Sequence, residues 1–138
     1  MNIAGSATGG LSPNVIANPN EERGVHYRLD AWKVSRQLVV AIYRLTQHFP
    51  KQELFGLTSQ MRRAAVSIPS NIAEGAARSG RREFIQFLNV ARGSLSELET
   101  QLLIAADLGY MRQDDPSFAM VNRVSKVITG LLKSVRGQ

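Results

Sequence analysis

The run from Phe84 to Ala105 constrains the fold more than any other part of this 138-residue sequence. Its apolar residues are separated by steps that alternate strictly between four and three. This spacing places all of them on one side of an α-helix, as in a coiled-coil seam. The seam consists of Phe84, Leu88, Ala91, Leu95, Leu98, Leu102 and Ala105. The pattern predicts a long amphipathic helix that packs against other helices.

The ends of this helix are marked by its flanking residues. We expect it to begin near Arg81, with Ser79 as a candidate N-cap, and to end at Leu108, where Gly109 is a C-cap signal. Four of its apolar residues lie off the seam and are available for another contact. They are Phe87, Val90, Leu103 and Ile104.

Two further segments, at residues 30–48 and 115–135, repeat apolar residues at helical spacing. Asp30 is an N-cap candidate for the first, and Asp115 followed by Pro116 is a strong start signal for the last. Their inward residues are Ala31, Val34, Leu38, Ile42, Leu45 and Phe49, then Val121, Val124, Ile128, Leu131 and Val135.

The remaining helix is expected to start near Leu54 and to end between residues 73 and 77. Pro69 lies inside it and should kink it, because proline removes one backbone hydrogen bond. Its apolar stripe is Leu54, Leu57, Met61, Ala65, Ile68 and Ile72. Polar side chains border that stripe, and we interpret them as packing or interface residues rather than catalytic ones. They are Gln60, Arg62, Arg63, Ser67, Asn71 and Glu74.

These segments predict an all-α fold, an antiparallel up-down-up-down four-helix bundle over residues 27–138. No internal repeat favours a solenoid instead. Residues 1–26 are rich in Gly, Ser, Asn and Pro, which predicts a flexible N-terminal tail. The sequence holds no cysteine, no secretory signal pattern and no membrane-spanning window, so we expect a cytoplasmic protein.

The net charge of +6 indicates an anionic partner such as nucleic acid, or serves solubility alone. In the expected topology, residues 28–36, 74–88 and 127–138 share one end of the bundle. That end carries eight basic and three acidic side chains, whereas residues 44–58 and 97–120 carry three basic and six acidic ones. The candidate nucleic-acid-binding residues are Arg28, Lys33, Arg36, Arg78, Arg81, Arg82, Lys133 and Arg136. Solvated arginines and helix C-terminal cations explain any single one of these equally well.

No constellation for catalysis is visible. His26 and His48 lack the spacing of zinc ligands, and Glu97 and Glu99 diverge on a helix. No Walker motif or nucleophile elbow occurs, and Glu74 is the best lone carboxylate. We therefore expect no enzymatic activity, no metal and no cofactor.

Three stretches carry a resemblance to a known family: "LTSQMRRAAVSIPSNIAEG", "EFIQFLNVARGSLSELETQL" and the "LGY" that follows. Residues 27–135 resemble the bacterial four-helix-bundle family of the 23S rRNA intervening-sequence protein. Accessory proteins of diversity-generating retroelements are similar too. The resemblance implies a homopentameric ring with no established enzymatic activity, and its retroelement members bind nucleic acid and a reverse transcriptase.

Two functions remain open. One is an oligomeric, basic accessory module that binds the backbone of RNA or DNA, with or without a protein partner. The other is a structural or protein-interaction ring with no nucleic-acid role, which the wide apolar faces of the first and third helices favour.

Overall fold

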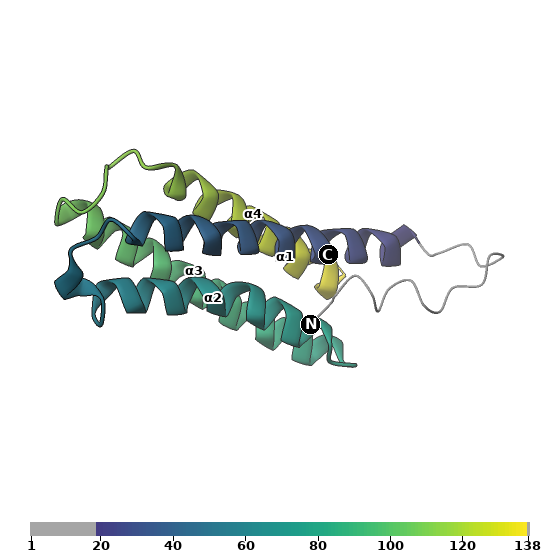
Figure 1. Ribbon diagram of the computed structural model, residues 1–138. Helices are drawn as coiled ribbons and strands as arrows, with labels where there is room; N and C mark the ends of the chain where they lie inside the picture. Colours follow the sequence, from purple (N-terminus) through teal and green to yellow (C-terminus); the bar gives the residue numbers. More distant parts are fainter. Residues whose placement is uncertain (1–18, 138) are drawn as a thin grey trace.

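The computed structural model describes residues 19–137, which form four α-helices and one short 3₁₀ turn and contain no strand (Figure 1). The elements are α1 (Pro19–Thr46), η1 (Lys51–Glu53), α2 (Leu57–Ala76), α3 (Arg81–Asp107) and α4 (Pro116–Arg136). Each helix packs against its neighbours in sequence, and α4 returns to pack against α1. Consecutive helices run in opposite directions, which confirms the predicted up-down-up-down bundle.

The α3 seam is confirmed as the centre of the core. Every seam residue from Leu88 to Ala105 is buried, and Phe84 packs partly buried at its start. The same core cluster includes Leu38 and Ile42 of α1 and Ile128 of α4. Complete burial of one such side chain stabilises the fold by about 1.5–3 kcal/mol, so the apolar spacing accounts for how the helices meet.

The start of α1 differs from the prediction. The helix begins at Pro19, so Asp30 lies inside it and is not an N-cap. Residues 19–26, assigned to the flexible tail, belong to α1, and residues 1–18 lie outside the described range. The physical reason is in the sequence: a proline at the first helical position and glutamates at 21 and 22 both favour a helix N-terminus.

The start of α2 was also predicted too early. Residues 51–53 form η1, and α2 begins at Leu57 after Gly56, which supplies no side-chain cap. The Glu53 carboxylate instead accepts a hydrogen bond from the Leu57 backbone N–H at 3.3 Å. Leu54 is consequently 48% exposed and is not a core residue.

Of the other three predicted helix-end residues, Asp115 and Gly109 are confirmed and Ser79 is wrong. Asp115 accepts a hydrogen bond from the Ser117 backbone N–H at 2.9 Å and caps α4 as predicted. Gly109 adopts the left-handed conformation expected after α3, with φ of 79°. Ser79 is not a cap, because α3 begins after Gly80 without a side-chain hydrogen bond.

Gly75 lies buried in the last turn of α2, where that helix packs closely against α3. A Cβ atom at this position would lie 2.6 Å from Cβ of Phe87 and 2.9 Å from Cδ1 of Phe84. Only a residue without a side chain fits between the two helices here. The close contact holds the ends of α2 and α3 together and thereby positions the arginines that follow.

Candidate nucleic-acid interface

The bundle topology gathers the predicted basic residues at one end. The start of α3 and the finish of α4 lie there together: a Cβ on Gly137 would be 4.0 Å from Nη1 of Arg81. Arg82 lies in the first turn of α3, Lys133 and Arg136 lie in the last turn of α4, and all three are exposed. The start of α3 and the finish of α4 thus bring together four of the eight candidate residues, Arg81, Arg82, Lys133 and Arg136.

The eight candidate residues differ in solvent exposure and in the partners that their side chains already have. Nη2 of Arg78 lies 3.3 Å from Oε1 of Glu74, and its guanidinium stacks 5.3 Å from the Phe87 ring centroid. Both partners of that ion pair are about half exposed, so the pair contributes at most about 1 kcal/mol. Arg28 is partly buried and its Nε has no hydrogen-bond partner, which makes it the least accessible of the eight.

A second cationic surface runs along α1 and α4, which pack against each other. Residues 31–49 and 116–137 carry seven basic side chains and no carboxylate, whereas residues 50–115 carry eight of each sign. We call this the α1–α4 cationic surface. Its residues are Lys33, Arg36, Arg44, Arg123, Lys126, Lys133 and Arg136, all exposed.

This surface was missed because charge was counted by the ends of the bundle. When charged side chains are counted instead for each pair of packed helices, the sequence shows the α1–α4 cationic surface, but this count requires knowing that α1 and α4 are neighbours. The carboxylates of α1 are Glu21, Glu22 and Asp30, all toward its start. Four of the seven surface residues belong to the predicted basic end, and Arg44, Arg123 and Lys126 extend the surface beyond it.

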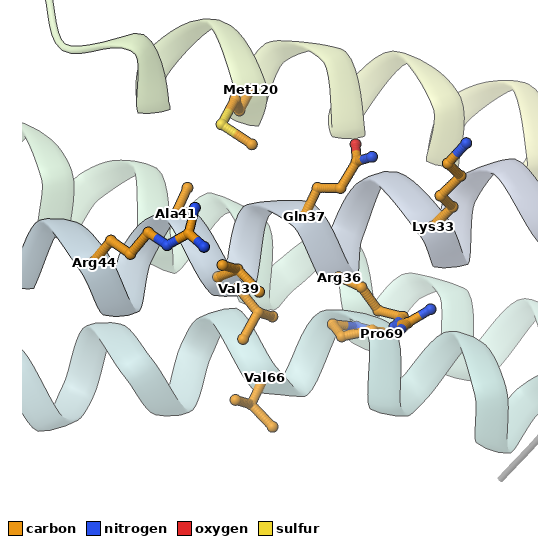
Figure 2. A pocket seen from close by; sticks show the side chains of 10 residues that line it. Lys33, Arg36, Gln37, Val39, Ala41, Arg44, Val66, Pro69 and Met120 are labelled. Atoms are coloured by element: carbon orange, nitrogen blue, oxygen red, sulfur yellow. The ribbon is translucent and has the colours of Figure 1, made fainter.

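A shallow groove of about 760 Å³ follows the outward side of α1 (Figure 2). Lys33 and Gln37 extend from α1 toward α4, while Arg36 lies beside Pro69 of α2. The groove combines an apolar floor with basic and neutral polar sides. Its lining residues are Lys33, Arg36, Gln37, Val39, Val40, Ala41, Arg44, Val66, Pro69 and Met120. The Arg36 guanidinium is held over the Trp32 ring, 4.4 Å from its centroid.

Ser67, one of the polar border residues of α2, joins that helix to α3, and Asn71 supports Ser67 from within α2. Oγ of Ser67 lies 2.8 Å from Oγ of Ser94, and Nδ2 of Asn71 donates to the carbonyl and Oγ of Ser67 at 2.7 and 2.9 Å. Gln60, Arg63 and Ser67 line a second hollow, of about 310 Å³, together with Ser94 and Glu97 of α3. These contacts satisfy polar groups within the bundle.

Arg62 joins α2 to α1 instead. Its Nε donates to Oγ1 of Thr46 at 2.9 Å, and its guanidinium lies 4.6 Å from the centroid of the Tyr43 ring. Thr46 is buried and donates in turn to the Ile42 carbonyl at 2.7 Å. Arg62 is thus a packing residue within one chain, and Glu74 is occupied by the ion pair with Arg78.

Neither metal nor membrane chemistry is indicated for the described residues. Within residues 19–137, no group of three or more His, Cys, Asp or Glu side chains is placed to hold a metal ion. None of the helices in that range is long and apolar enough to cross a membrane.

Residues 19–137 define an all-α four-helix bundle in which two adjacent helices, α1 and α4, carry seven exposed cations over residues 31–49 and 116–137. Residues 27–130 match the family model described as 23S rRNA-intervening sequence protein, and the chain belongs to that family. A protein of unknown function from the S23 ribosomal protein family of Bacteroides thetaiotaomicron is structurally similar, with a TM-score of 0.72 at 22% identity. That likeness covers 78% of this chain and 98% of the other. A search of curated proteins gave no match.

Proposed function

We propose that this protein is a non-enzymatic accessory module that binds the phosphate backbone of RNA or DNA. The observation that carries the proposal is the separation of charge: all carboxylates are absent from residues 31–49 and 116–137, which hold seven cations. A surface without carboxylates attracts phosphates and releases their counterions, largely without regard to base sequence.

The dimensions of the surface suit a nucleic-acid helix. The 21 residues of α4 span about 32 Å at 1.5 Å per residue. A duplex exposes one phosphate per strand every 3.4 Å, so this length faces about nine base pairs. Arg81 and Arg82, at the start of α3, would extend the contact with nucleic acid from the side of α4 onto the end of the bundle. A nucleic-acid partner also leads us to propose a cytoplasmic location.

The test is a fluorescence-polarisation titration of RNA and DNA duplexes across a salt series. We expect binding that weakens steeply with salt. In the variant Arg123→Gln/Lys126→Gln, the slope of log K against log salt should fall in magnitude by about 2, about 1 for each lost contact.

The matched control is Lys51→Gln/Arg92→Gln, which removes one exposed lysine and one exposed arginine from the charge-balanced half of the chain. This variant has the same net charge as the first but should keep most of the slope. Equal losses in both variants would assign binding to net charge alone and contradict the proposed surface, as would binding that is insensitive to salt.

A second candidate function, a protein-interaction ring without a nucleic-acid role, is favoured by the exposed apolar side chains of α3. Val90, Leu103 and Ile104 are 53%, 50% and 44% exposed. Charge reversal at Arg78, Arg81 and Arg82 separates the two functions. The nucleic-acid function predicts weaker binding with an intact oligomer, and the ring function predicts no change.

A further inference from the structure

A third hollow lies between α1 and α2 and adjoins the groove along α1. It measures about 480 Å³ and shares Arg36 and Pro69 with that groove. This volume falls in the range of about 300–1,000 Å³ that is typical of sites for small ligands. We call it the Trp32 hollow, and its lining residues are Trp32, Arg36, Pro69, Ser70, Ala73 and Glu74.

The side chains of the Trp32 hollow suit a flat, aromatic group. Trp32 is only partly buried, and the guanidinium of Arg36 lies 4.4 Å from the centroid of its ring. Pro69 and Ala73, both buried, line the hollow from α2, and Figure 2 shows Arg36 beside Pro69. Indole rings and guanidinium planes are the two protein groups on which unstacked nucleobases most often stack.

The charges of the hollow favour a base over a phosphate. One cation, Arg36, is balanced by one carboxylate, Glu74, whereas the adjoining groove has three cations and no carboxylate. A carboxylate repels phosphate but accepts hydrogen bonds from the N–H groups at the edges of guanine, cytosine and adenine. In a duplex those bases are paired and stacked on both faces, so only an unpaired base can enter a side-chain hollow.

The hollow and the groove lie side by side, as the parts of a single-strand site must. A strand whose phosphates contact Lys33, Arg36 and Arg44 in the groove would pass the mouth of the Trp32 hollow. We propose that this hollow takes one unpaired base of a single strand of RNA or DNA. The inference rests on the proposed function and deepens it, because it names single-stranded nucleic acid as the preferred ligand.

The experiment uses the intrinsic fluorescence of Trp32, which is the sole tryptophan of the sequence and therefore reports on this hollow alone. The full chain is titrated with single strands of RNA and DNA, with abasic strands of the same length, and with duplexes. Binding is followed by polarisation of a labelled strand in parallel. We expect quenching of Trp32 by the base-containing single strands and none by abasic strands or duplexes, although all of them bind.

A stacked base should also raise affinity. We expect the base-containing single strand to bind about 5- to 140-fold more tightly than the abasic strand at equal salt. Trp32→Leu should remove this excess. Because Trp32 packs partly against the core, Ser70→Leu provides a second variant: Ser70 is exposed, and a leucine there fills the hollow without a change in charge.

Ser70→Leu should lose both the quenching and the excess affinity while it keeps the binding of duplexes. The matched control is Ser96→Leu, which places the same side chain at an exposed position of α3, outside the hollow. This control should retain the quenching and the excess affinity of the natural chain.

The outcomes separate this inference from the proposed function. Salt-dependent binding of duplexes and abasic strands, without quenching by base-containing strands, would overturn the inference and leave the proposed function standing. Absence of binding to every probe would overturn both. Equal quenching by abasic strands, or equal losses in Ser70→Leu and Ser96→Leu, would show that no base occupies the Trp32 hollow and would also overturn the inference.

Discussion

At the scale of single residues, Gly75 fixes how closely α2 and α3 approach. Alanine is the better helix former by about 1 kcal/mol, so an isolated helix would gain from the substitution. In the bundle, the added Cβ would meet the Phe87 Cβ at 2.6 Å, and one helix must shift. We expect Gly75→Ala to lower the free energy of unfolding by about 1–3 kcal/mol, measured by urea denaturation.

Gly93 provides the matched control. It lies within α3, and a Cβ atom there would have no neighbour within 4 Å. Gly93→Ala should therefore raise the free energy of unfolding by roughly 0.5–1 kcal/mol. If both substitutions shifted stability in the same direction, the close approach of α2 and α3 would not be the reason that glycine is needed at position 75. The sequence indicates only that α2 ends between residues 73 and 77, the range that holds Gly75, because a contact between helices leaves no mark in local spacing.

At the scale of helices, the α4 start was predictable and the α3 start was not. Asp115 followed by Pro116 is a local signal, since the carboxylate needs only the Ser117 N–H two residues on. We expect Asp115→Ala to lower the free energy of unfolding by about 1 kcal/mol, measured by urea denaturation. Ser79→Ala should leave it unchanged, because Ser79 makes no cap hydrogen bond. A comparable loss of unfolding free energy in both variants would indicate that Ser79 caps α3 after all.

The same contrast explains the other helix boundaries. The α3 seam predicted its packing because periodic apolar residues report directly on burial. Leu54 fits the period of α2 but lies in the connection after η1, where Glu53 and not periodicity decides where the helix begins. The start of α1 at Pro19 was missed because residues 19–26 have no apolar period to reveal a helix.

At the scale of the whole molecule, charge is sorted by helix pair as well as by end. Counting charge by the ends of the bundle identified Arg81, Arg82 and Arg136, which lie at the start of α3 and the finish of α4. Counting by ends missed Arg123 and Lys126 of α4. Their significance depends on the neighbouring helix α1, which has no carboxylate over residues 31–49. Sequence reasoning therefore predicted part of the candidate interface, and the remainder required the knowledge that α1 and α4 adjoin.

Repulsion among the seven cations lowers the stability of the folded bundle, and a bound polyanion should reduce that repulsion. We expect inorganic polyphosphate at low salt to raise the midpoint temperature by several degrees, because it binds the folded cationic surface. The shift should be smaller in Arg123→Gln/Lys126→Gln than in Lys51→Gln/Arg92→Gln, measured by circular dichroism. Identical shifts in these two variants would mean that polyphosphate does not select the α1–α4 cationic surface.

The neighbourhood of Gly137 and Arg81 bears on how this chain can be tagged for such work. A peptide appended after residue 138 would start next to the arginines of α3. An acidic epitope in that place would be a tethered competitor, at about millimolar effective concentration, for the phosphate backbone that we propose as the ligand. A neutral tag, or removal of the tag by proteolysis, keeps that corner of the bundle open.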